Sequence, residues 1–269
     1  MTDSIELTKH NAVATVTLNR PEKHNAFDDA VIRQMTEAFE NVEHDDSICL
    51  MVLASRGKCF SAGADLAWMK RMASYSYDEN LCDSRALANM LKTLNNLSKP
   101  SIARVQGAAF GGAVGLVSCC DIAIASSKAS FCLSEVKIGL IPATISPYVI
   151  AAIGSRAARR LFITAERFSA EQALALNLVS EVCEQDQLDA RLDELVETIR
   201  ANSPAAVTAA KRLVNDISGA CIDDDLIEDT CKRIAEIRTS SEGQEGLSAF
   251  LDKRTPLWVA NQPDRSRLT

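Results

Sequence analysis

The chain has 269 residues, of which 47% are hydrophobic and 24% charged, and its formal net charge is −7. These values are typical of a globular protein and exclude a disordered chain. The negative net charge also disfavours nucleic acid or an anionic membrane surface as the main partner, because both are themselves negatively charged.

The cysteine and histidine content argues against metal and disulfide sites. There are nine cysteines and three histidines, with no Cys-x-x-Cys pair, so the spacing typical of structural zinc or a disulfide framework is missing. We expect free, mostly buried thiols in a reducing compartment. Residues 1–6 contain two acids and no apolar core of a signal peptide, which predicts a cytoplasmic location.

The first part of the chain alternates strand patterns with helical patterns. Apolar residues recur at helical spacing over 31–42, and Asn25 or Asp28 can cap that helix. A long helical pattern then ends near Lys99. Strands are predicted at Ile5–Lys9, Ala12–Leu18 and Ile48–Ala54, the last of these as a strand buried on both faces of a largely parallel sheet.

The second part continues with short strands and then becomes helical. Residues 169–172 form a capping box that opens a helix. Ser203-Pro204 is a signal for the start of a helix, and the pattern over Thr208–Leu251 predicts two or three amphipathic helices and no strand. We therefore place a boundary near residue 200, between a core (1–200) and a helical region (201–269). Further strands are predicted at Ser101–Val105, Asp121–Ala125, Ala129–Leu133 and Leu178–Cys183.

Two long uncharged stretches, 105–120 and 138–155, contain glycine or proline, and we interpret them as buried backbone near a site, not as membrane spans. The first holds a glycine-rich segment, residues 107–115. It is no P-loop, because Ala113 and Val114 occupy the places of the lysine and the hydroxyl residue, and the glycine register of a dinucleotide site also fails. Adjacent glycines at a helix start leave free N–H groups that suit an oxyanion. Close helix–strand packing without a ligand is the alternative.

Two further features point to the same chemistry. The segment Phe60–Leu66 repeats the order of strand, small residues and helix, so that one N–H from each segment could form an oxyanion hole. Glu135 lies in a largely uncharged stretch, where burial would raise its pKa and suit it to acid/base work. A solvated loop acid is the alternative for Glu135. His24 has no nucleophile elbow to serve, so a triad role is not expected.

Together these segments resemble the enoyl-CoA hydratase/isomerase (crotonase) family. The resemblance covers nearly the whole chain. It implies an α/β fold, a spiral of strand–strand–helix turns with a C-terminal helical region through which members assemble as homotrimers or dimers of trimers. The matching segments are Asn19–Ala26, Phe60–Leu66, Gly107–Leu116, Cys120–Ile124, Phe131–Pro142 and Gly246–Arg254.

The resemblance also implies roles for individual residues. The backbone N–H groups of Ala64 and Gly112 would hold the thioester oxygen of an acyl-CoA substrate, and Glu135 would be the principal acid/base. No separate cofactor is implied, because CoA is part of the substrate. Contacts with the substrate are implied for Lys23, His24, Ala26, Ala62, Asp65, Leu66, Gly115, Phe250 and Lys253.

One departure from the family bears on the reaction. Hydratases of this family usually carry two glutamates, and the first would fall at Gly115. The alternatives are a single-base isomerase, a CoA-ester-binding protein whose catalysis has decayed, and a hydratase in which Glu135 acts alone and a substrate group fills the room above Gly115. We favour the last, because residues 106–124 and 68–72 look similar to bacterial methylglutaconyl-CoA hydratase-like proteins of leucine breakdown. Lys70 or Arg71 could face the carboxylate of such a substrate, although both could equally be solvated helix charges.

Overall fold

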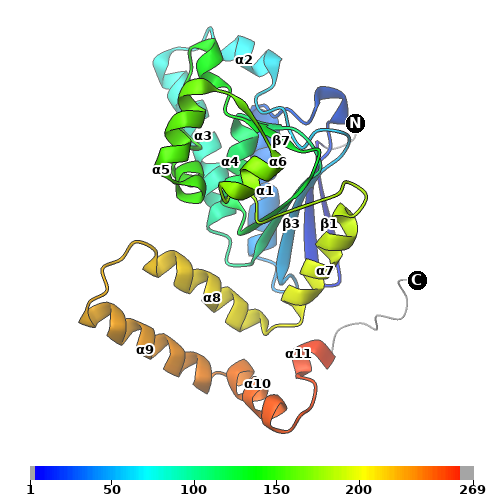
Figure 1. The fold of residues 1–269 in the computed structure, drawn as a ribbon, viewed down its shortest axis with the longest axis vertical. Coiled ribbons are helices and arrows are strands. Elements are labelled where there is room, and N and C mark those ends of the chain that lie inside the picture. Colours follow the sequence, from blue (N-terminus) through cyan, green and yellow to red (C-terminus); the bar gives the residue numbers. More distant parts are fainter. Residues whose placement is uncertain (1–3, 261–269) are drawn as a thin grey trace. The chain divides into compact units, whose positions relative to one another are not determined.

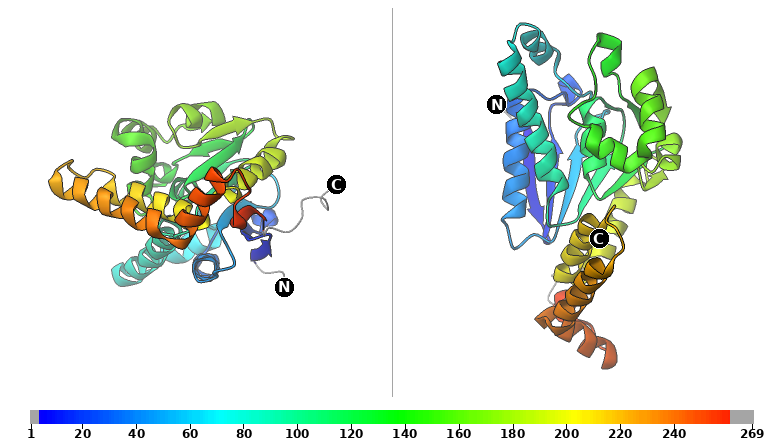
Figure 2. Two further views of the ribbon diagram at one scale, coloured as in Figure 1. Left: turned by 90° about the horizontal axis from the view of Figure 1, so that it is seen from below. Right: turned by 90° about the vertical axis from the view of Figure 1, so that its left-hand side faces the viewer.

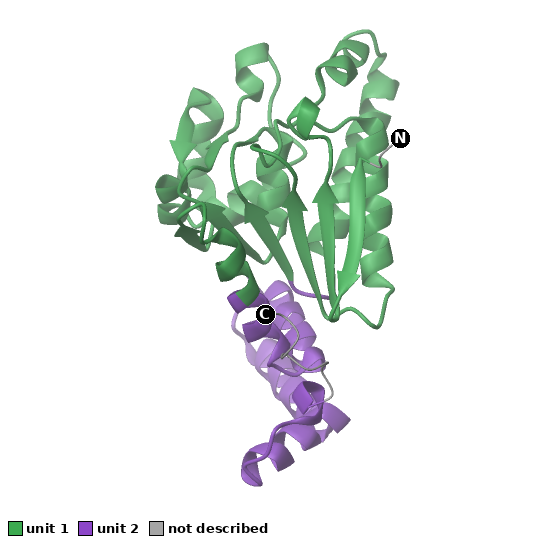
Figure 3. Ribbon diagram, turned by 90° about the vertical axis from the view of Figure 1, so that its right-hand side faces the viewer, with its two compact units in different colours: residues 1–97, 101–193 green, residues 98–100, 194–269 purple. Residues whose placement is uncertain are grey.

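The computed structural model describes residues 4–260, and contacts within the chain divide it into two compact units (Figure 3). The first holds residues up to 97 and residues 101–193, and the second holds residues 98–100 and those from 194 onward. The division falls within α7 (Leu188–Arg200), a few residues ahead of the boundary predicted near residue 200. The outermost residues of the two predicted domains, 1–3 and 261–269, lie outside the described residues.

A six-stranded sheet forms the centre of the first unit (Figure 1). β1 runs antiparallel to β2, and the other neighbours are parallel. The predicted α/β class is confirmed, and β3 is buried on both faces as expected. In order across the sheet, the strands are β1 (Ile5–His10), β2 (Val13–Leu18), β3 (Leu50–Ser55), β4 (Ser101–Val105), β6 (Ile122–Ser126) and β9 (Glu181–Cys183).

A second, three-stranded sheet consists of β5 (Ala109–Phe110), β7 (Ser130–Cys132) and β8 (Arg167–Ser169). An isolated bridge between Ser61 and Ala109 extends it by one segment. Successive turns of the chain therefore place one strand in the large sheet, a short one in the small sheet, and then a helix. β5 and β8 were not predicted from the sequence, because strands this short carry no alternation pattern.

The helices of the first unit pack in a row. α1 lies against α3, α3 against α4, and α4 against α5, and α1 and α3 run side by side in the right-hand view of Figure 2. The capping box of residues 169–172 is confirmed at the start of α6. α5 was not predicted. The helices are α1 (Asp29–Glu43), α2 (Leu66–Met72), α3 (Tyr77–Asn95), α4 (Gly112–Cys119), α5 (Ser146–Thr164) and α6 (Ala170–Ala175), with short 3₁₀ turns η1 (Pro21–Lys23) and η2 (Glu135–Ile138).

The second unit is helical, as predicted. Its helices are α8 (Pro204–Ile217), α9 (Asp224–Thr239), α10 (Ser241–Leu251) and the short α11 (Leu257–Ala260). The Ser203 side chain caps α8, whose first residue is a proline. Apolar side chains on α10 are exposed, with Phe250 at 81% and Leu251 at 75%. Assembly through this region stays a prediction.

All nine cysteines are free thiols, but only Cys119 and Cys132 are buried, so the expectation of mostly buried thiols is wrong. In the range 4–260, no helix is long and apolar enough to cross a membrane, and no group of three or more acidic, histidine or cysteine side chains is placed to hold a metal ion.

Asp28, and not Asn25, caps α1, and its carboxylate accepts a hydrogen bond from the Val31 N–H at 3.0 Å. We expect Asp28→Ala to lower the free energy of unfolding by about 1–2 kcal/mol, because a helix donor loses its acceptor. Asp28→Asn keeps an acceptor oxygen and should cost less. Urea denaturation of both variants checks this, and equal losses would contradict the capping role.

Candidate active site

The loop that contains Ala64 pairs with the segment of Phe27, and this pairing leaves the N–H group of Ala64 without an acceptor. Phe27 and Ala64 form an isolated parallel bridge. The Phe27 N–H donates to the Gly63 carbonyl at 2.9 Å, and the Asp65 N–H donates to the Phe27 carbonyl at 3.0 Å. Because residues 63 and 65 make both bonds to Phe27, the N–H of Ala64 points the other way. It has no acceptor among the described residues.

The second free N–H belongs to Gly112, the first residue of α4. A first helical residue has no intrahelical acceptor, and none is found elsewhere in residues 4–260. Gly111 precedes it with a φ of 54°, a conformation that favours glycine. A Cβ placed on Gly63 would stand 2.6 Å from the Phe110 carbonyl oxygen and 3.6 Å from the Gly112 nitrogen. The backbone next to Ala64 is therefore in direct contact with the backbone at the start of α4.

Glu135 lies beside this turn. It follows β7 and opens η2, and its Oε1 is 3.2 Å from the place that a Cβ on Gly111 would occupy. Its Oε2 is buried without a hydrogen-bond partner. Burial raises the pKa of Glu135 above the ordinary value of 4.5. Glu135 is therefore half-buried and is not a solvated loop acid. Its role as an acid/base stays a prediction.

The loops predicted to hold CoA are brought together around the same point. The Ala62 N–H donates to the His24 carbonyl at 2.9 Å. His24 is left-handed with a φ of 51°, and its Nδ1 is 3.8 Å from the Cys59 Sγ. Lys23, His24, Ala62 and Leu66 are exposed, whereas Ala26 is buried. Their contact with CoA stays a prediction, as does that of Phe250 and Lys253 in the second unit.

The side chain of Asp65 bears on one prediction, that of a contact with substrate. It is only 5% exposed, and it accepts hydrogen bonds from the N–H groups of Ala67 at 2.8 Å and Trp68 at 3.3 Å, which caps α2. It also pairs with Arg20 at 3.3 Å and Lys23 at 3.4 Å. Burial by itself would raise its pKa, but these N–H groups and the Lys23 ammonium hold the pKa below its usual value. The carboxylate therefore has its partners inside the fold, and a contact of Asp65 with substrate stays a prediction.

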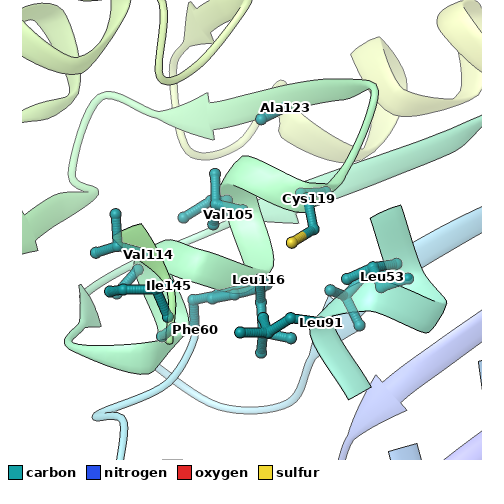
Figure 4. Close-up of a cluster of buried hydrophobic side chains, with 14 of the residues drawn as sticks. Leu53, Phe60, Leu91, Val105, Val114, Leu116, Cys119, Ala123 and Ile145 are labelled. Atoms are coloured by element: carbon teal, nitrogen blue, oxygen red, sulfur yellow. The ribbon is translucent and has the colours of Figure 1, made fainter. Parts of the chain in front are cut away.

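Gly115 corrects a second prediction. A Cβ on this residue would stand 2.3 Å from the Cγ2 and 2.8 Å from the Cβ of Ile145, and 3.5 Å from the Leu91 Cδ2. Ile145 is 2% exposed, and Figure 4 shows it with Leu91 in the cluster of buried side chains around α4. The room expected above Gly115 is therefore filled with hydrocarbon. Gly115 permits close packing and does not bind substrate.

Sequence reasoning missed Phe27, Arg20 and Ile145 as residues that shape the site. Phe27 directly follows the recognised segment Asn19–Ala26, but a buried phenylalanine carries no chemical signal. Arg20 lay within that segment without an assigned role. Ile145 gave no signal, because its contact with Gly115 joins residues far apart in the sequence.

Comparison with known proteins gives concordant results. Residues 8–261 match the family model described as enoyl-CoA hydratase/isomerase. The chain is similar to the crystal structure of an enoyl-CoA hydratase from Shewanella pealeana, with 46% identity, a TM-score of 0.92, and coverage of 95% of this chain and 96% of that one.

Two curated relatives carry different activities in their names. One is the 2,3-dehydroadipyl-CoA hydratase of Escherichia coli, 30% identical over 251 residues, which are 93% of this chain and 96% of the relative. The other is the mitochondrial Delta(3,5)-Delta(2,4)-dienoyl-CoA isomerase of Dictyostelium discoideum, 30% identical over 259 residues, which are 93% of this chain and 88% of the relative.

The contact between Gly115 and Ile145 predicts coupled stability effects. Gly115→Ala should lower the free energy of unfolding by about 1–3 kcal/mol through overpacking, and Ile145→Ala by about 2–5 kcal/mol through a cavity. The double variant should lose less than the sum, because the shortened side chain at position 145 leaves room for the new methyl group. A double-mutant cycle by urea denaturation measures this, and strict additivity would refute the contact.

The raised pKa of Glu135 predicts a pH-dependent stability. A carboxyl group whose folded pKa lies above its unfolded value loses stability as pH rises through the folded pKa. Glu135→Gln cannot ionise, so we expect it to be more stable than the wild type at about pH 8 and equally stable at about pH 4, where both side chains are neutral. Thermal melts across this range check it. Glu40→Gln, which removes one exposed carboxylate, serves as control.

Proposed function

The chain belongs to the enoyl-CoA hydratase/isomerase family, and from that premise we propose that it is an enoyl-CoA hydratase in which Glu135 alone is the acid/base. Its α/β architecture is that of the crotonase fold. One observation carries the proposal. The buried carboxyl group of Glu135, with an unpartnered oxygen, lies beside the glycine turn that presents the free N–H of Gly112.

In this proposal the thioester oxygen accepts hydrogen bonds from the N–H groups of Ala64 and Gly112. Addition at C3 of the enoyl group moves negative charge onto that oxygen, so the donors bind the enolate more tightly than the substrate. Each donor contributes about 2.7–4 kcal/mol to the stability of the transition state. The N-terminus of α4 adds its partial positive charge.

Glu135 moves the proton. Its carboxylate takes a proton from water while the water oxygen bonds to C3, and the protonated carboxyl group then gives a proton to C2 of the enolate. One O–H bond of water is broken, and a C–O and a C–H bond are formed, which yields a 3-hydroxyacyl-CoA. The raised pKa of Glu135 brings it nearer to neutral pH, where it can act in both directions.

A second candidate is a double-bond isomerase. Ile145 covers Gly115, where family hydratases usually carry their first glutamate, so the site offers one carboxylate. A shuttle of one proton between two carbons of an allylic system needs only one base, and it incorporates no water oxygen. A CoA-ester-binding protein without turnover is the candidate from another class.

For the substrate we propose a branched enoyl-CoA that carries its own carboxylate, of the methylglutaconyl-CoA type. A relative named for 2,3-dehydroadipyl-CoA, a thioester with a second carboxyl group, supports this. Arg71 is engaged by Asp29, whereas Lys70 is exposed and has no ion pair within residues 4–260, so Lys70 is the cation proposed for that carboxylate. A cytoplasmic homotrimer or dimer of trimers, and a role in leucine breakdown, belong to the same proposal.

The test is turnover in ¹⁸O-water with methylglutaconyl-CoA and crotonyl-CoA. We expect label at C3 of the product and a higher kcat/KM for the carboxylated ester. Glu135→Gln should lower kcat by about 10²–10⁴-fold, because the proton carrier is lost, while calorimetry gives an unchanged Kd for acyl-CoA. Glu40→Gln is the matched control.

The outcomes separate the candidates. Migration of the double bond without uptake of label would favour the isomerase. Binding without turnover, and without solvent exchange at C2, would favour the binding protein. Unchanged turnover of Glu135→Gln would remove Glu135 from the mechanism.

A further inference from the structure

We propose that Phe27 is a positioning residue that sets the separation between the two N–H donors of the oxyanion hole. The inference rests on the proposed function and adds to it a residue that touches neither substrate nor the reacting atoms. Phe27 is 1% exposed and contains no chemically reactive group. Its backbone is bound to one donor segment, and its ring is packed against the other.

The backbone of Phe27 fixes Ala64. The two hydrogen bonds of the bridge, at 2.9 and 3.0 Å, involve the residues on either side of Ala64. The Ser61 hydroxyl supports the same loop, since it donates to the Asn25 carbonyl at 2.8 Å and accepts from the Gly63 N–H at 3.1 Å. The direction of the Ala64 N–H therefore follows from the position of the Phe27 backbone.

The ring of Phe27 fixes Gly112. A Cβ on Gly112 would stand 2.8 Å from the Phe27 Cζ and 3.3 Å from its Cε2. The tip of the ring thus takes the place that a side chain would occupy at residue 112. Since the ring has only two rotatable bonds and is fully buried, it holds the start of α4 at a fixed distance from the bridge.

Arg20 stabilises the bridge between Phe27 and Ala64. Its guanidinium, with the side chain 12% exposed, donates to the Ala26 carbonyl at 2.9 Å and pairs with Asp28 at 3.2 Å and Asp65 at 3.3 Å. Residues 26 and 28 flank Phe27, and residue 65 flanks Ala64. The bridge between Phe27 and Ala64 is therefore held at both of its strands by one buried cation.

Removal of the ring would allow the Gly112 turn to move toward the bridge, while the bridge itself stays paired. A displacement of about 1 Å at a catalytic group can lower turnover about 100-fold. We expect Phe27→Ala to lower kcat by about this factor and to leave the Kd for acyl-CoA nearly unchanged, because the CoA-binding loops keep their hydrogen bonds.

The experiment measures carbonyl polarisation directly, by isotope-edited infrared spectroscopy of butyryl-CoA labelled with ¹³C at its carbonyl. Hydrogen bonds from the two N–H groups should lower the carbonyl stretching frequency of the ligand bound to the wild type. Phe27→Ala should lose most of that shift together with kcat. Phe27→Leu keeps a branched apolar side chain, so it should retain part of the carbonyl shift and part of kcat. If the alanine variant does not fold, the leucine variant provides the test.

Phe39→Ala is the matched control, because Phe39 is also fully buried but lies within α1, whereas Phe27 precedes that helix. It should lose stability and keep the wild-type carbonyl shift. The inference fails if both Phe27 variants keep the full shift and kcat, or if Phe39→Ala loses both equally. Absence of any shift in the wild type would instead overturn the oxyanion hole and with it the proposed function.

Discussion

Two backbone N–H groups, those of Ala64 and Gly112, have no acceptor within residues 4–260, and the candidate site is built around them. The surrounding structure keeps both in this state. It does so by geometry. Ala64 faces away from the bridge that its neighbours form with Phe27, and Gly112 begins a helix. Both donors are thereby left available, as the proposed oxyanion hole needs.

Four glycines of the candidate site allow different features, either a backbone turn or a close packing contact. Gly63 and Gly111 have positive φ values of 85° and 54°, which turn the two loops toward each other. Gly112 leaves room for the ring of Phe27, and Gly115 leaves room for Ile145. A single glycine-rich segment therefore combines a turn, a donor and two close packing contacts.

Two side chains from outside α4, those of Glu135 and Ile145, lie against its glycine segment and differ in chemistry. Glu135 lies over Gly111, and Ile145 lies over Gly115, four residues further along the helix. The first is a carboxyl group whose pKa is raised by burial, and the second is hydrocarbon. The described part of the candidate site thus has a carboxyl group beside the Gly111 turn and an apolar wall next to it. The proposal of a single acid/base rests on this arrangement.

The sequence by itself determined the features that depend on local pattern. Runs of apolar and β-branched residues indicated the strands of the large sheet, and the capping box of residues 169–172 indicated the start of α6. Strand–glycine–helix order pointed to the segments of Ala64 and Gly112, and an uncharged stretch after a strand pointed to Glu135. Such signals are contained in short stretches of neighbouring residues. Only the tertiary structure decided that Asp65 forms an ion pair with Arg20, that Ile145 fills the space above Gly115, and that Phe27 packs against Gly112. Each of these contacts joins residues far apart in the sequence, and packing between distant segments leaves no periodic trace in either one.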